Sequence, residues 1–92
     1  MATYLLEAYL PRSRVEDARA AGDRARAAAE ELSREGADIH YVRTTFLPED
    51  ETCFHVFEAS SEALVEEVSR RAALRHARIV PALEAPRRPG RR

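Results

Sequence analysis

The chain has 92 residues, of which 45% are hydrophobic and 34% are charged, and its formal net charge is −1. This length suits one small domain, and no apolar run approaches the roughly 18 residues that a membrane-spanning helix needs. Because the chain has one cysteine, an internal disulfide and a paired-cysteine zinc site are both excluded.

The first predicted element is a strand over residues 3–10, which read T-Y-L-L-E-A-Y-L. Its side chains are apolar on both faces apart from Glu7, a pattern typical of a central strand that is covered on both sides. Pro11 ends the strand. We therefore place this strand in the middle of a sheet.

A long helix is predicted next, beginning at a capping box over residues 13–16 and ending at a terminator at Gly36. Ser13 and Glu16 have the spacing of a capping box, in which their side chains would satisfy free amide groups at the helix start. Small and apolar side chains recur at helical spacing, so this helix can lie close to a sheet. The stripe consists of Val15, Ala18, Gly22, Ala25, Ala29 and Leu32.

Two strands joined by an acidic turn are predicted, the first over residues 39–47 and the second including residues 53–58. Pro48 can open the turn, and the three acidic residues after it keep the tip solvated. In the second strand, the two-residue period places Cys53 and His55 on one face. If paired residues have numbers that sum to about 100, the opposite face forms an apolar set that lies under the helices. This set is Val42, Thr44, Phe46, Phe54 and Val56.

A second helix is predicted after Ser60 or Ser61, either of which can cap it. Its apolar stripe consists of Leu64, Val65, Val68 and Ala72. Two surface ion pairs of favourable orientation are also predicted, Glu66 with Arg70 and Glu67 with Arg71.

The order of these elements, βαββαβ, predicts an α+β fold of the ferredoxin-like type. This fold is a four-stranded antiparallel sheet in the order 4-1-3-2 with two helices on one face. The last strand, residues 78–83, contains Pro81, which cannot donate a ladder hydrogen bond and so belongs at an edge. The order 4-1-3-2 satisfies this requirement and also places the apolar first strand in the middle. We assign residues 1–85 to this single domain.

The segment 86–92 is rich in arginine and proline and has no apolar side chain, so it is predicted to be a disordered tail. It carries a charge of +4, whereas residues 1–85 carry −5 from 11 arginines and 16 acidic residues. The tail has no aromatic residue to stack on bases, and nucleic acid is therefore not an expected partner. The amino terminus lacks the features of an export signal, so a cytoplasmic protein is expected, with no membrane association.

The second face of the sheet is where we expect a functional site and a partner. Continuing the alternation places Cys53 and His55 on this face with Glu7, Tyr9 and Arg43. An amphipathic sheet face of this kind commonly packs against a second copy and leaves a pocket between the sheets. We therefore expect a homodimer that forms through the open sheet face.

Three segments resemble the DUF4242 family, whose members are small bacterial α/β proteins. The segments are Y-L-L-E-A-Y-L-P at 4–11, T-F-L-P-E-D-E-T-C-F-H-V-F-E-A-S-S-E at 45–62 and R-R-A-A-L-R-H-A-R-I-V at 70–80. Some members are described as nickel-binding proteins with a dimeric ferredoxin-like fold. The resemblance covers residues 3–84 and implies this fold, a dimer and a nickel site. Glu7, Cys53 and His55 are the donor residues that lie at matching positions.

Metal chemistry can also be assessed from the residues themselves. Nickel accepts imidazole nitrogen, carboxylate oxygen and thiolate, and needs three or four donors at about 2 Å. Cys53 and His55 supply two donors from one strand, and Glu7 would supply a third from its neighbour. The competing interpretation is that Cys53 is an inert core residue and that His55 is a packed, hydrogen-bonded side chain.

An enzyme is the alternative from another class of function. Dimeric ferredoxin-like domains also act as oxygenases, cyclases and isomerases that need no cofactor, with a histidine base and an oxyanion stabilised by tyrosine or arginine. His55, Glu7, Tyr9 and Arg43 can be assigned to these roles, with Tyr9 and Arg43 binding the small molecule. A purely structural dimer, in which Glu7 pairs with Arg43, is a third interpretation. The sequence favours a small cytoplasmic binding protein for a divalent transition metal such as nickel, ahead of a pocket for a small molecule or an enzyme.

Overall fold

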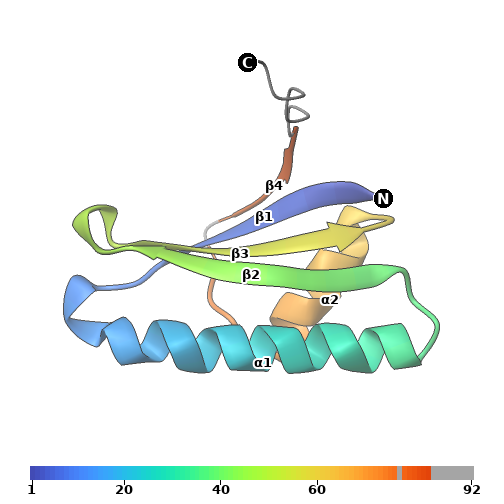
Figure 1. Cartoon of the computed structure of the whole chain (residues 1–92), viewed down its shortest axis with the longest axis horizontal. Coiled ribbons are helices and arrows are strands. Elements are labelled where there is room, and N and C mark those ends of the chain that lie inside the picture. The colour runs from blue at the N-terminus through green and yellow to red at the C-terminus, as the bar shows by residue number, and fades with distance from the viewer. Residues whose placement is uncertain (77, 84–92) are drawn as a thin grey trace, which may run out of the picture.

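The computed structural model describes residues 1–76 and 78–83, which form one four-stranded antiparallel sheet with two helices on the same side of it (Figure 1). The main elements are β1 (Ala2–Tyr9), α1 (Val15–Arg34), β2 (Ile39–Leu47), β3 (Thr52–Ala59), α2 (Glu62–Arg71) and β4 (Arg78–Ala82). Within the described ranges, no helix is long and apolar enough to cross a membrane. The predicted tail, residues 86–92, lies outside the described residues.

The strands lie in the order β2-β3-β1-β4, and every neighbouring pair is antiparallel. Read from the β4 edge, these neighbours are β4, β1, β3 and β2. Strand β1 is therefore central, as its apolar sequence predicts. Pro81 lies in the edge strand β4, where a missing N–H group costs no ladder hydrogen bond.

Helix α1 begins without the predicted capping box. A 3-10 turn over Arg12–Arg14 precedes it, Arg14 is the N-cap residue, and no side chain caps the helix. The Arg14 amide instead donates to the Pro11 carbonyl at 2.9 Å. The prediction that Ser13 and Glu16 cap this helix is therefore wrong, because the backbone turn after Pro11 takes the place of a side-chain cap.

The end of α1 agrees with the prediction. Gly36 has a φ of 100°, which a residue with a side chain rarely adopts. Its amide donates to the Ser33 carbonyl and the Ala37 amide to the Leu32 carbonyl, both at 3.0 Å. These two bonds form a Schellman motif, which satisfies the last carbonyl groups of the helix.

The pairing of β2 with β3 differs from the predicted register and turns the predicted outer face of β3 toward the helices. Near the turn, the numbers of paired residues sum to 99 rather than 100, as in Thr44 with His55, and the register shifts again between Tyr41 and Arg43. A shift of one residue turns every side chain to the other face of a sheet, and a bulge does the same within one strand. The placement of Val42, Phe54 and Val56 under the helices is therefore wrong.

The side of the sheet that faces the helices consequently includes Cys53, His55 and Phe57. Phe57 has no exposed surface and stacks edge-on against Tyr41, with ring centroids 5.9 Å apart. The alanines of α1 pack on this layer. The buried cluster consists of Leu6, Ala25, Ala28, Ala29, Leu32, Ile39, Phe57, Ala59, Val65, Val68 and Ala72. A cysteine and a histidine thus lie beside an apolar core rather than on an open surface.

The acidic turn holds the connection between β1 and α1. Glu51 follows the short turn Pro48–Asp50 in a left-handed conformation, with φ at 50°. Its carbonyl accepts the Leu10 amide at 2.9 Å, and its carboxylate accepts the Arg12 amide at 3.0 Å. The turn therefore fixes where α1 starts relative to β3.

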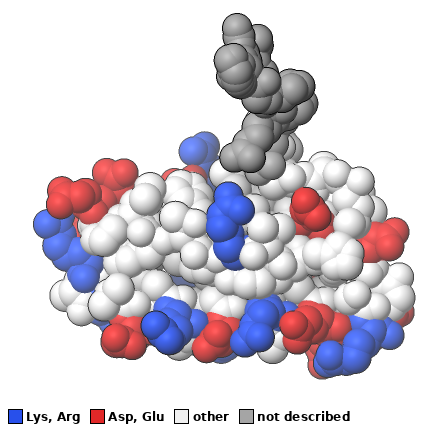
Figure 2. All heavy atoms as spheres, in the orientation of Figure 1, with Lys and Arg blue, Asp and Glu red and all other residues white. Residues whose placement is uncertain are grey.

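An ion-pair network on the surface joins α2 to α1. Arg71 contacts Glu31 at 2.7 Å, Glu35 at 2.8 Å and Glu67 at 2.8 Å. Hydrogen bonds from Arg71 lower the pKa of Glu35, and bonds from Arg70 and then Arg71 lower the pKa of Glu67. Along α1, acidic and basic side chains are mixed on the surface (Figure 2). Arg70 contacts Glu67 and not the predicted Glu66.

Replacing Arg71 with alanine should lower the urea midpoint of unfolding more than Arg70→Ala, because Arg71 bridges the two helices whereas Arg70 bonds within α2 only. The carboxylates with lowered pKa stabilise the fold above their ordinary titration range and lose this effect as the pH falls through the lowered pKa. The difference between the two variants should therefore shrink at acid pH and in molar salt. Equal midpoints at neutral pH and low salt would show that the network contributes nothing.

Candidate functional site

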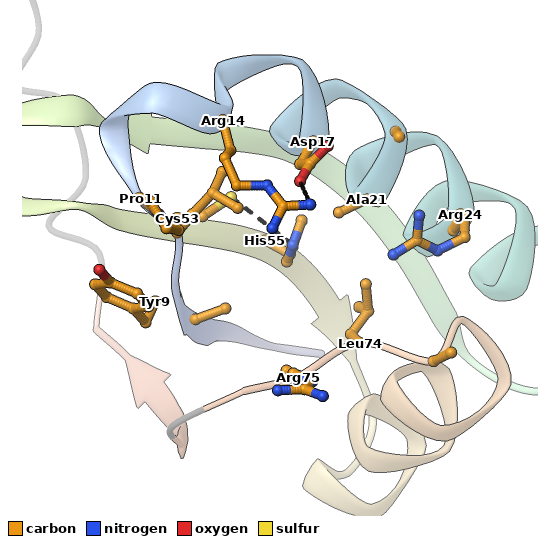
Figure 3. Close-up of a pocket in the computed structure, with 14 residues that line it drawn as sticks. Tyr9, Pro11, Arg14, Asp17, Ala21, Arg24, Cys53, His55, Leu74 and Arg75 are labelled. Atoms are coloured by element: carbon orange, nitrogen blue, oxygen red, sulfur yellow. Dashed lines mark hydrogen bonds and ion pairs between the residues drawn. The ribbon is translucent and has the colours of Figure 1, made fainter.

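A cavity of about 700 Å³ opens between the start of α1, one end of the sheet and the segment that follows α2 (Figure 3). Its size falls within the range of small-ligand pockets. It is lined by Ala8, Tyr9, Leu10, Pro11, Arg14, Asp17, Ala20, Ala21, Arg24, Cys53, His55, Ala73, Leu74 and Arg75.

Cys53 and His55 form the floor of this cavity. They lie two residues apart on β3, so both side chains point to the helix side of the sheet. The Cys53 Sγ atom lies 3.8 Å from His55 Nε2, which is close enough for a weak hydrogen bond that involves sulfur. Only 2% of Cys53 and 1% of His55 is exposed. The cavity is therefore the route by which a ligand reaches them.

The other nitrogen of His55 is held by a chain of hydroxyl groups. His55 Nδ1 lies 2.7 Å from Thr44 Oγ1, which lies 2.7 Å from the Tyr41 hydroxyl. When Nδ1 donates its proton to Thr44, the lone pair of Nε2 faces Cys53 and the cavity. The chain thus orients the imidazole ring and can select its tautomer.

Gly22 allows α1 to lie against this chain of hydroxyl groups. A Cβ atom at Gly22 would lie 2.9 Å from Thr44 Oγ1 and 3.3 Å from the Tyr41 hydroxyl. Real Cβ atoms essentially never lie within 3.0 Å of such a neighbour, and the second distance is tighter than most Cβ contacts. Glycine at this position is therefore required by the close packing of helix on sheet.

Burial keeps both floor residues neutral. Loss of solvent, and then the positive charge of Arg24, lower the pKa of His55 to about 4. Burial raises the pKa of the Cys53 thiol. At neutral pH the pair is therefore a neutral imidazole beside a thiol, and a thiolate forms there only with a compensating positive charge.

Three arginines surround the cavity above this floor. The Arg14 guanidinium pairs with Asp17 at 2.6 Å, and Arg24 Nε donates to the Ala72 carbonyl at 2.9 Å. Arg75 approaches from the segment after α2, opposite Arg24 of α1 and Arg14, the N-cap residue of that helix (Figure 3). The floor is neutral, so the charge of the cavity comes from these side chains.

The five predicted site residues separate into two groups. Tyr9, Cys53 and His55 line the cavity. Glu7 is paired with Phe54 across the sheet and lies on the face that the helices leave uncovered, where its carboxylate accepts a hydrogen bond from Arg78 at 2.7 Å. Glu7 cannot join Cys53 and His55 in one site, because the observed register puts them on opposite faces.

Arg43 also lies away from the cavity. It is exposed on the edge strand β2 and is paired with Val56, so it shares the uncovered face with Glu7. The predicted pairing of Glu7 with Arg43 is not formed, because Glu7 bonds to Arg78 instead. The assignment of Arg43 to the same small-molecule site as His55 is therefore wrong.

The cavity, and the hydroxyl chain that bonds His55, also contain residues that the sequence reasoning missed. Arg14 is the N-cap residue of α1, and Asp17 and Arg24 follow it at spacings of three and seven residues, a pattern that could have identified all three. Thr44 was assigned to a different face from His55, because nothing in the strand alternation revealed the register shift. Arg75 follows α2, and no periodicity indicated where it points.

No protein-family model matches this chain, and no curated protein matches it. A solved structure with a similar fold is that of SCO4226 from Streptomyces coelicolor A3(2). The TM-score is 0.62 at 17% sequence identity, and the match covers 91% of this chain and 100% of that chain. At this identity the likeness shows a shared fold alone.

The imidazole of His55 should titrate near pH 4, as followed by NMR. Its pKa is lowered on folding, so its contribution to stability is complete above the unfolded value of 6.5 and is lost as pH falls to about 4. This contribution amounts to roughly 3 kcal/mol. His55→Gln should remove this pH dependence, and an ordinary titration near 6.5 would contradict the buried, neutral imidazole.

Gly22→Ala should destabilise the protein by roughly 1–2 kcal/mol in urea unfolding, because the cost of overpacking exceeds the gain in helix propensity. It should also shift the NMR signals of His55, since the added methyl displaces Thr44. Gly36→Ala is the control, because it strains the backbone at a place with no neighbouring atom within 4 Å. A more stable Gly22→Ala protein would disprove the close contact.

Proposed function

We propose that this chain is a metal-binding protein, and that Cys53 Sγ and His55 Nε2 bind a divalent transition metal such as nickel at the floor of the cavity. The observation that carries the proposal is the 3.8 Å separation of these two atoms. A metal–sulfur and a metal–nitrogen bond together span roughly 4.3 Å, so one ion can contact both atoms. Thiolate and imidazole are ligands that nickel, zinc and copper accept.

The donor set fits a site that is completed from the cavity. Among the described residues, no group of three or more histidine, cysteine, aspartate and glutamate side chains is placed to hold an ion. Two protein ligands leave further positions for water or a small molecule, as in metal sites that keep an open position. The bound ion would supply the positive charge that lets the Cys53 thiol lose its proton.

The surroundings of His55 also support the proposal. Metal-binding histidines usually hydrogen-bond through their second nitrogen, and Thr44 provides this bond. Because the pKa of His55 is about 4, protons do not compete for Nε2 at neutral pH. The imidazole is therefore oriented and available before any ion arrives.

A pocket for a small molecule is the second candidate, and the cavity volume of about 700 Å³ favours it. In a cofactor-independent enzyme of this kind, His55 would be the base and a cavity arginine would stabilise the anion. The neutral imidazole beside the cavity is compatible with that role. The metal proposal has the stronger support, because Cys53 has a role in it and none in proton transfer.

Four broader predictions accompany this proposal. The βαββαβ order supports a ferredoxin-like fold, and the resemblance to DUF4242 stays a prediction from sequence, as does the cytoplasmic location. A homodimer through the uncovered sheet face also stays a prediction, which the partly buried apolar side chains there support. They include Leu5, Phe54 and Val80.

Titration of the purified protein with cobalt or nickel should give a sulfur-to-metal absorption band and a dissociation constant below the millimolar range. Cys53→Ser should abolish the band, and His55→Gln should weaken binding strongly. Thr44→Val should weaken it by roughly 10- to 100-fold through the lost hydrogen bond. Glu7→Gln is the matched control and should bind normally. Unchanged binding in Cys53→Ser and His55→Gln, or none in the wild type, would disprove this site.

A further inference from the structure

The arginines above the floor indicate a second ligand for the same cavity. We propose that the cavity binds a small organic carboxylate, whose charged group lies among Arg14, Arg24 and Arg75 and whose apolar body lies against the cavity wall. This inference names a ligand class for the cavity and does not depend on metal at Cys53 and His55, because different residues make the two sites.

The charge of the cavity is opposite to that of the domain. Four charged side chains line it, three arginines and Asp17, which leaves a net charge of +2 (3 − 1). Residues 1–85 as a whole carry −5 (11 − 16). Arginines gathered around a hollow in a protein of net negative charge favour an anion there.

The guanidinium groups are available to a ligand. Arg24 uses Nε to bond the Ala72 carbonyl, which fixes the side chain while its terminal nitrogens have no partner among the described residues. Arg75 makes no hydrogen bond or ion pair with any described residue, although it lines the cavity. The pair of Arg14 with Asp17 is solvent-exposed on both sides, with side-chain exposures of 64% and 44%, so it contributes little and can rearrange around an anion.

The walls between the arginines are apolar. They are formed by Ala8, Leu10, Pro11, Ala20, Ala21, Ala73 and Leu74. Arginine binds a carboxylate through two parallel hydrogen bonds, whereas an apolar wall offers nothing to a fully hydrated ion such as phosphate. A ligand with one carboxylate and an apolar body therefore matches both parts of the cavity.

The experiment uses the full chain freed of metal with a chelator, and benzoate as the probe. NMR titration should show binding at millimolar or lower concentration, with shifts confined to residues that line the cavity, such as Leu10, Ala21 and Leu74. Benzamide has the same ring without the charge and should bind at least tenfold more weakly. Inorganic phosphate should also bind more weakly than benzoate.

The variant Arg14→Gln/Arg75→Gln should weaken benzoate binding by roughly tenfold or more, which is the effect of losing charge-assisted hydrogen bonds. Arg19→Gln removes the same type of charge from an exposed position of α1 outside the cavity. This variant should bind benzoate as tightly as the wild type. Equal binding of benzamide, tighter binding of phosphate, or equal losses in Arg14→Gln/Arg75→Gln and Arg19→Gln would overturn the proposal.

The two proposals fail separately. Cys53→Ser should lose metal and keep benzoate, whereas Arg14→Gln/Arg75→Gln should lose benzoate and keep the cobalt absorption band. Absence of benzoate binding in a protein that binds cobalt would disprove the carboxylate site alone. Absence of cobalt binding in a protein that binds benzoate would disprove the metal site alone.

Discussion

The close contact of α1 with the sheet at Gly22 is the constraint on which the rest of the site depends. A methyl group at Gly22 would lie closer to Thr44 than real Cβ atoms do, and it would also crowd the Tyr41 hydroxyl. Because the helix lies so near, His55 is shut off from solvent, and its Nδ1 atom finds its partner within the protein, in Thr44. A buried imidazole without such a partner would cost several kilocalories per mole. The small side chains of α1 therefore determine both the packing and the state of the histidine.

Burial beside a cavity gives Cys53 and His55 their particular chemistry. On an open sheet face both groups would titrate in their ordinary ranges and compete with water for any ligand. At the cavity floor the imidazole stays neutral down to a pKa of about 4, and the thiol stays protonated because its pKa is raised. A cation that enters the cavity can lower the pKa of the Cys53 thiol again, because it stabilises the thiolate. The neutral floor thus suits a cation and the arginines above it suit an anion. The two ligands bind to different residues.

The fold could be predicted from sequence in its elements and their order, because these follow from local signals. Gly36 ends α1 where its positive φ permits, and Pro81 marks an edge strand because it has no amide proton. The capping box at Ser13 failed for a different reason. Its spacing is correct, but the chain forms a 3-10 turn after Pro11, so that Arg14 rather than Ser13 is the N-cap residue of α1. Spacing alone does not reveal this shift of the helix start by one residue.

The sequence by itself determined the type and order of the elements, and it singled out Cys53 and His55 as neighbours on one face of a strand, since the two-residue period is a property of the strand alone. Only the tertiary structure decided whether Cys53 and His55 lie on the helix side of the sheet or on the uncovered side. The outcome depends on a one-residue difference in pairing and on a bulge between Tyr41 and Arg43, and a strand with apolar side chains on both faces does not specify either. For the same reason Glu7 and Arg43 left the site, while Arg14, Arg24 and Arg75 entered it from segments that meet only when the helices pack on the sheet.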